Sequence, residues 1–143
     1  MLHMSKEEYP KVYLYRRIVQ AKLFIDNNYF NKIDLNNIAE TAFFSKFHFI
    51  RLFKKAYNKT PHQYLIFVRI KSAKLILKTG ISITDVCYSI GFESLSSFTD
   101  LFKRQVGTTP SAYRKQQQKR KNEILKIPLK FVPGCYSRSN DWS

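Results

Sequence analysis

Apolar residues recur along this chain at intervals of three and four positions, the spacing that places side chains on one face of an α-helix. Two groups show it most clearly: Phe49, Leu52 and Phe53, then Phe98, Leu101 and Phe102. Each group is followed by a helix start signal, Thr60-Pro61 or Thr109-Pro110, because threonine caps a helix and proline suits its first position. With 4 Gly and 5 Pro in 143 residues, turns are few. We predict an all-α fold.

The same pattern occurs twice. Residues Leu35–Phe44 align with Ile83–Phe92 at an offset of 48, and after a one-residue insertion the alignment continues at an offset of 49. Asn58 and Gly107 then fall at equivalent positions, two residues before each Thr-Pro pair. Asn and Gly best tolerate the left-handed backbone that closes a helix. The repeat therefore preserves a backbone requirement as well as apolar positions.

Each copy predicts a helix, a tight turn and a second helix, which is helix-turn-helix geometry. In the first copy, Asp34 caps a helix over 35–42, and the next helix begins near Ser45. In the second copy the corresponding helices begin after Ser82 and near Ser94. Three further helices complete the prediction: an opening helix over about 11–29, a linker helix over 61–79 and a last helix over about 110–121. The opening helix carries its apolar side on Ile18, Leu23, Phe24 and Ile25.

The charge is strongly unbalanced, with 25 Lys and Arg against 10 Asp and Glu, a formal net charge of +15. No acidic residue occurs between Glu40 and Asp85 or between Asp100 and Glu123. Such a basic surface predicts an anionic partner, with nucleic acid as the first candidate and acidic membrane as the second. The alternative is a solvated lysine-rich surface without a partner.

Catalytic and metal-binding patterns are absent from the sequence. It has no paired carboxylates at helical spacing, no phosphate-binding glycine loop and no Cys/His metal set, and His3, His48 and His62 are scattered. We expect no enzyme activity, no metal and no cofactor. Cys87 lies on an apolar helical stripe and is predicted to be a core residue. Without a signal peptide or a membrane-spanning run, the chain is expected to be soluble, cytoplasmic and without a membrane partner.

Five segments of the second copy form a long spaced pattern: Ser82–Phe92 (SITDVCYSIGF), Ser97-Phe98, Leu101–Arg104 (LFKR), Gly107–Pro110 (GTTP) and Tyr113-Arg114. In this pattern the chain resembles the AraC/XylS family of bacterial transcription regulators, over roughly residues 15–120. The resemblance implies sequence-specific DNA binding and transcription regulation, with activation as the tendency of the family.

The resemblance also implies an AraC-type DNA-binding domain of seven helices over residues 1–121. Its first helix-turn-helix unit would occupy about 15–60, its linker helix 61–79 and its second unit about 81–121. The tail over 122–143 receives no role. One departure is that the first copy has Phe43 where the second has Gly91, which predicts a different backbone at the first turn.

In such a protein a recognition helix enters the major groove with its N-terminal residues toward the bases. In the first unit we expect base contacts from Lys46, Phe47, Ile50 and Arg51. Arg51 is the best candidate for a bidentate contact to guanine, and Phe47 and Ile50 suit thymine methyl groups. For these two, burial in the core is the alternative. Contacts to the DNA backbone are expected from Ser45, His48, Lys54 and Lys55.

In the second unit the corresponding base contacts are expected from Leu95, Ser96, Ser97, Thr99 and Asp100. This helix lacks an arginine on its reading face, so we expect less base readout from it. Asp100 either accepts from a cytosine amine, repels phosphate, or is an exposed surface charge. Contacts to the DNA backbone are expected from Ser94, Lys103 and Arg104.

The expected partner is double-stranded DNA, bound by a monomer at an asymmetric site of about two helical turns. RNA polymerase is a second candidate partner. The stretch before the first unit is too short for a small-molecule effector domain, so the chain resembles stand-alone members of the family, unless it is a fragment of a longer protein. The competing hypothesis is a basic module that binds nucleic acid without sequence preference.

Overall fold

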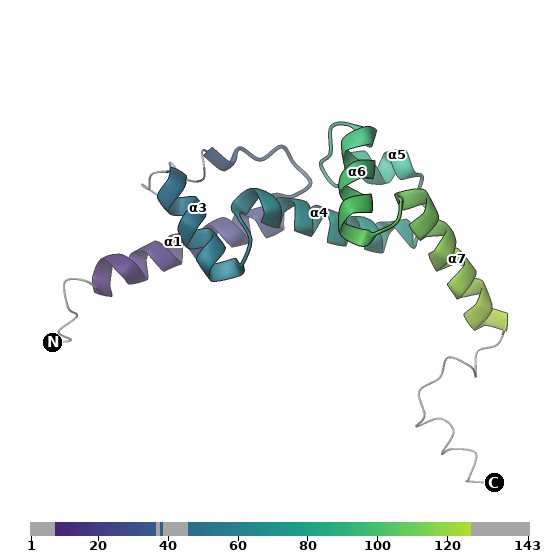
Figure 1. The fold of residues 1–143 in the computed structure, drawn as a ribbon, viewed down its shortest axis with the longest axis horizontal. Coiled ribbons are helices and arrows are strands. Elements are labelled where there is room, and N and C mark those ends of the chain that lie inside the picture. The colour runs from purple at the N-terminus through teal and green to yellow at the C-terminus, as the bar shows by residue number, and fades with distance from the viewer. Residues whose placement is uncertain (1–7, 37, 39–45, 127–143) are drawn as a thin grey trace, which may run out of the picture.

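The computed structural model describes residues 8–36, 38 and 46–126, and every regular element within these ranges is an α-helix (Figure 1). In chain order the helices are α1 (Glu8–Asn28), α3 (Lys46–Tyr57), α4 (Pro61–Leu77), α5 (Ile83–Ser89), α6 (Leu95–Val106) and α7 (Pro110–Lys126). The prediction of an all-helical fold is confirmed for these residues.

The expected count of seven helices is not matched, because the described ranges hold six. The missing one was predicted over 35–42, and most of that segment lies outside the described residues. Where it is described, the chain is helical at Leu35, Asn36 and Ile38. The Asp34 carboxylate accepts a hydrogen bond from the backbone N–H of Asn36 at 2.9 Å, as expected of a residue that caps a helix.

Helix α4 forms the axis of the molecule. It begins with a capping box, in which the Thr60 hydroxyl accepts from the Gln63 N–H and the Gln63 side chain accepts from the Thr60 N–H. Helices α1 and α3 pack against one end of α4, and α5, α6 and α7 pack against the other (Figure 1). A long helix over Pro61–Leu77 therefore lies where the linker helix was predicted over 61–79.

Each unit buries its own hydrophobic core. The first core consists of Ile18, Ala21, Ile25, Phe49, Phe53 and Leu65. The second consists of Ile66, Ile70, Ala73, Leu77, Val86, Cys87, Ile90, Phe92, Phe98, Phe102 and Tyr113. Successive residues of a helix point about 100° apart, so α4 can direct Leu65 into one core and Ile66 into the other. Cys87 lies in the core, as predicted.

Two sequence predictions about the outer helices are wrong. Leu23 and Phe24 of α1 are 48% and 46% exposed, because α1 buries only a narrow stripe that includes Ile18 and Ile25. Helix α7 continues to Lys126 instead of ending near residue 121. No glycine or proline interrupts residues 122–126, so the chain has no local reason to stop there. The rest of the predicted tail, 127–143, lies outside the described residues.

Within the described ranges, no helix combines the length and the apolar character that a membrane span requires.

Candidate nucleic-acid interface

Helix α3 divides cleanly into a buried face and a cationic face. Phe49 and Phe53 are 1% and 0% exposed, with ring centroids 6.0 Å apart. The remaining positions include exposed side chains that were predicted to contact DNA: Lys46, Phe47, His48, Arg51, Lys54 and Lys55. The i, i+4 spacing explains the division, because it returns to the same face after about one turn.

Phe47 and Ile50 differ in exposure. Phe47 is 76% exposed, so the alternative of burial in the core is excluded for this side chain. Ile50 is half-buried and packs against the first core, so only part of it is open to a partner. An exposed phenylalanine at the start of a cationic helix is an apolar surface of the kind that contacts thymine methyl groups.

Helix α6 repeats this division. Phe98 and Phe102 are fully buried, with ring centroids 5.7 Å apart. Most of the residues predicted to contact DNA from this helix are exposed: Leu95, Ser96, Ser97, Asp100, Lys103 and Arg104. In the described residues, α6 therefore carries fewer cations than α3, and it also carries an acid, Asp100.

The hydroxyl groups at the start of α6 are engaged locally, and those of Ser96 and Ser97 lie 3.2 and 3.0 Å from the Ser94 hydroxyl. The Ser94 hydroxyl accepts from the Ser97 N–H at 3.1 Å and so caps the helix. The half-buried Thr99 donates its hydroxyl proton to the Leu95 carbonyl at 2.8 Å. Ser94 and Thr99 therefore position the helix, whereas the exposed Asp100 side chain is open to an external group. The remaining predicted contact, Ser45, lies outside the described residues, as does Phe43 in the first turn.

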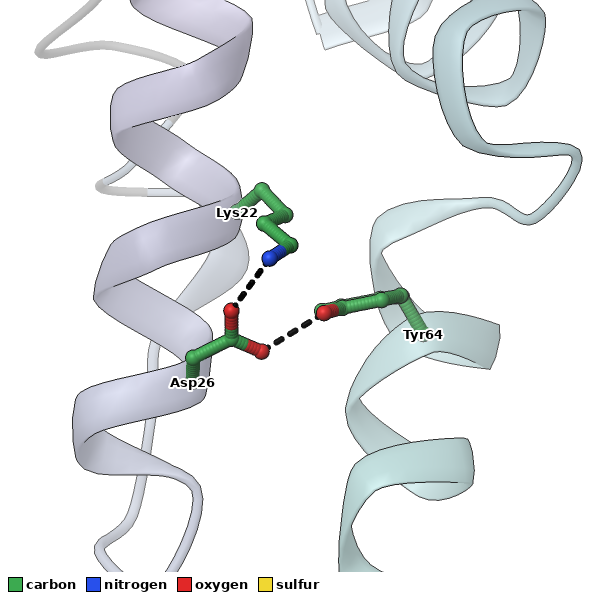
Figure 2. Close-up of polar contacts among 3 residues, drawn as sticks. All are labelled: Lys22, Asp26 and Tyr64. Atoms are coloured by element: carbon green, nitrogen blue, oxygen red, sulfur yellow. Dashed lines mark hydrogen bonds and ion pairs between the residues drawn. The ribbon is translucent and has the colours of Figure 1, made fainter.

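Three polar side chains, Lys22, Asp26 and Tyr64, link α1 to α4 (Figure 2). The Tyr64 hydroxyl donates to one oxygen of Asp26 at 2.6 Å, and the Lys22 ammonium lies 2.7 Å from the other. Partial burial and this hydrogen bond raise the pKa of Tyr64 from 10.0 to about 12. The contact between the Lys22 ammonium and the Asp26 carboxylate raises the pKa of Lys22.

Arg69 is the residue whose position the sequence analysis missed. It belongs to the acid-free stretch between Glu40 and Asp85, from which a basic surface is predicted, but it is 9% exposed. The signal was its place in the apolar stripe of α4, three residues after Ile66 and four before Ala73. Burial lowers the pKa of Arg69, and nearby Glu93 opposes that effect.

Across the described ranges, no three His, Cys, Asp or Glu side chains gather in a way that would hold a metal ion.

The chain is similar in sequence to known helix-turn-helix proteins. Residues 38–116, more than half of the chain, match the family model described as a helix-turn-helix domain. An HTH-type transcriptional regulator from Pseudoalteromonas carrageenovora is 35% identical over 98 residues, which is 68% of this chain and 58% of that protein. The bifunctional transcriptional activator/DNA repair enzyme AdaA of Bacillus subtilis is 31% identical over 96 residues, 66% of this chain and 46% of that protein. The chain thus spans about half the length of these relatives.

The fold is also similar to solved structures. The DNA-binding domain of AdpA, a global transcriptional factor solved in complex with a target DNA, superposes with a TM-score of 0.68 and 28% identity. The match covers 72% of this chain and 94% of that domain. The C-terminal domain of AraT, a response regulator from Geobacillus stearothermophilus, has a TM-score of 0.66 at 20% identity, covering 70% of this chain and 84% of that one.

Proposed function

Because the chain belongs to the AraC/XylS-type family of helix-turn-helix transcription regulators through its DNA-binding domain, we propose that it binds double-stranded DNA at a specific sequence, with α3 and α6 each entering a major groove. The observation that carries this proposal is the exposed face of α3. Phe47 and Arg51 stand there beside Lys54 and Lys55, on a helix whose other face is anchored by Phe49.

Affinity and specificity come from different residues. The cations Lys54, Lys55, Lys103 and Arg104 are exposed in the last turns of α3 and α6, where they suit phosphate contacts that carry no sequence information. Earlier in each helix lie the groups for base edges: Lys46, Phe47, Arg51, Leu95, Ser96, Ser97 and Asp100. Arg51 reads guanine, and α3 supplies more of the specificity than α6 because α6 carries no arginine in its first two turns.

The binding unit is a monomer. Successive major grooves on one face of B-DNA lie about 34–36 Å apart, and one chain offers two equivalent recognition helices joined by α4. The site is then asymmetric, with two different half-sites. Bound there, the protein activates transcription, a role that the activator named among its relatives supports. RNA polymerase is the candidate partner for that step.

In vitro selection from a random duplex library tests this function directly. The expected result is an enriched bipartite sequence that the protein prefers over bulk random DNA by roughly 10³-fold or more. The net charge of +15 also suits a basic module that binds nucleic acid without sequence preference. Failure of repeated selection rounds to enrich any sequence, together with equal competition by random DNA, would favour that second function.

Footprinting on the selected duplex separates monomeric from dimeric binding. A monomer with two recognition helices protects two adjacent major grooves at one protein per duplex. A gel shift with a mixture of the chain and a longer tagged form should give two bands and no intermediate band. An intermediate band would show that two chains bind together.

A further inference from the structure

The two hydrophobic cores orient the recognition helices relative to each other only through their separate packing on α4. Leu65 belongs to the first core, and Ile66, Ile70, Ala73 and Leu77 belong to the second. The two units share α4 but bury their apolar residues separately. Contacts made directly between the units add a second restraint on their relative rotation, beyond the packing of each core on α4.

Arg69 lies where the units meet. Its Nε donates to the carbonyl oxygen of Tyr29 at 2.7 Å, and its Nη2 donates to that of Asn31 at 3.0 Å. Both acceptors follow the end of α1, where the helix dipole favours a cation. On its other side the guanidinium lies 5.6 Å from the centre of the Phe92 ring. One side chain on the linker helix thus touches the first unit and the second.

Gly91 brings the turn of the second unit against the same place. Its φ is +96°, and a Cβ atom there would lie 2.7 Å from the Tyr29 carbonyl oxygen and 2.9 Å from Arg69 Nη2. The Tyr29 hydroxyl is also 3.0 Å from the Ser72 hydroxyl on α4. The second turn therefore requires glycine for its close approach to the first unit as well as for its own backbone.

An exposed ion pair also links the two units at this junction. Lys32 of the first unit and Glu93 of the second lie 3.7 Å apart, with side chains 90% and 78% exposed. Exposed pairs of this kind contribute little. The contacts of Arg69 and Gly91 stabilise the junction more than the Lys32–Glu93 pair does. A buried guanidinium that lost its carbonyl partners would be left without hydrogen bonds.

We propose that Arg69 is a positioning residue that locks the rotation of the second helix-turn-helix unit against the first, and so sets the half-site spacing that the protein accepts on DNA. The proposal rests on the proposed function, since half-sites exist only if both recognition helices read DNA. The residue acts through Tyr29, Asn31 and Gly91, and has no contact with DNA itself.

The test is a comparison of DNA spacings. Arg69→Met keeps a long apolar stem and removes both hydrogen bonds. Duplexes from the selection are extended or shortened by one base pair between the half-sites, which rotates one half-site by about 34°. The wild type should lose about tenfold or more in affinity on the shifted duplexes, the loss expected when one half-site is displaced. Arg69→Met should lose about threefold or less, because its units can rotate to follow the DNA.

Lys71→Met is the matched control, because Lys71 is exposed on the same helix and the substitution removes the same charge. It should weaken binding to all duplexes alike and leave the ratio between spacings at the wild-type value. If Arg69→Met also keeps the wild-type ratio while its circular dichroism is native, the proposal is overturned. If Arg69→Met does not fold, Arg69→Lys takes its place, since lysine keeps the charge but lacks the planar fork that reaches two carbonyls.

A measurement without DNA keeps this proposal separate from the proposed function. Spin labels at cysteines introduced for Ala56 and Gln105, exposed near the ends of α3 and α6, report the distance between the recognition helices by pulsed electron paramagnetic resonance. Cys135→Ser removes one native thiol, and Cys87 is buried. The distance distribution should be narrow in the wild type and broad in the Arg69 variants. Distance distributions of equal width in the wild type and the Arg69 variants would overturn the proposed role of Arg69, even if the DNA selection had succeeded. If the selection failed and the Arg69 variants still gave a broad distribution, the role of Arg69 would stand and the DNA-binding function would be rejected.

Discussion

Asn58 and Gly107 occupy the same left-handed backbone position in the two units, with φ of 60° and 93°. Asn58 lies just past α3 and Gly107 just past α6, and each donates its N–H to a carbonyl one turn back, on Lys54 and Lys103, at 2.8 Å. Among the described residues that are not glycine, Asn58 is the one with positive φ. The equivalence expected from the repeat is therefore confirmed at the level of backbone conformation.

Substitutions of Asn58 should change stability according to how well the new residue tolerates the left-handed backbone conformation. Asn58→Ala is expected to lower the free energy of unfolding by about 1 kcal/mol, since a Cβ without a local polar partner is strained in this conformation. Asn58→Gly should be neutral or stabilising. As control, Ala56→Gly in the right-handed part of α3 should cost about 1 kcal/mol. Urea unfolding of the three variants measures the differences, and equal losses for both glycine variants would contradict the assignment.

Gly91→Ala should destabilise the protein more than Gly80→Ala. Both glycines have positive φ, +96° and +86°, but a Cβ at Gly80 meets nothing within 4 Å. The backbone strain of about 1 kcal/mol is therefore common to both. Gly91→Ala adds the clash with the Tyr29 carbonyl, roughly 1–3 kcal/mol more. Thermal unfolding of the pair decides the matter, and equal melting temperatures would show that the close approach at Gly91 relaxes easily.

Tyr64→Phe should change stability in two ways. At neutral pH the loss of the hydrogen bond to Asp26 should cost about 1 kcal/mol. In alkali, the folded protein keeps the Tyr64 proton to a pKa of about 12, whereas the unfolded chain releases it near 10.0. The stabilising contribution of Tyr64 is therefore complete below pH 10 and declines as the pH rises toward 12. Urea unfolding at pH 9 and pH 11 should show a smaller decline for the variant, and identical declines would contradict this pKa.

Arg51→Ala and Lys54→Ala should weaken DNA binding differently. Arg51→Ala is expected to cost about 1–3 kcal/mol on the selected duplex and to relax the preference at one base pair. Lys54→Ala should weaken all sequences alike and lower the salt dependence by about one counterion. Binding titrations on the selected duplex and its single-base variants, at two salt concentrations, separate these patterns. A uniform loss from Arg51→Ala would assign that arginine to phosphate.

Local features of the chain predicted local structure well. The Thr60 and Ser94 caps, the start of α4 at Pro61 and the inward pairing of Phe98 with Phe102 all follow from neighbours within one or two turns. Such features depend on helical spacing and on the orphan backbone groups at helix ends, which act within a few residues. The sequence by itself therefore determined where these helices begin, the repeat and the family.

The tertiary structure decided which side chains of each helix find a partner. Leu23 and Phe24 belong to an apolar stretch but remain exposed, because the surface that meets α1 is only wide enough for a narrow stripe. Arg69 is charged but buried, because carbonyl groups about forty residues earlier in the chain point toward it. Helical periodicity describes one helix at a time. The burial of a polar group depends on acceptors that folding brings from distant segments.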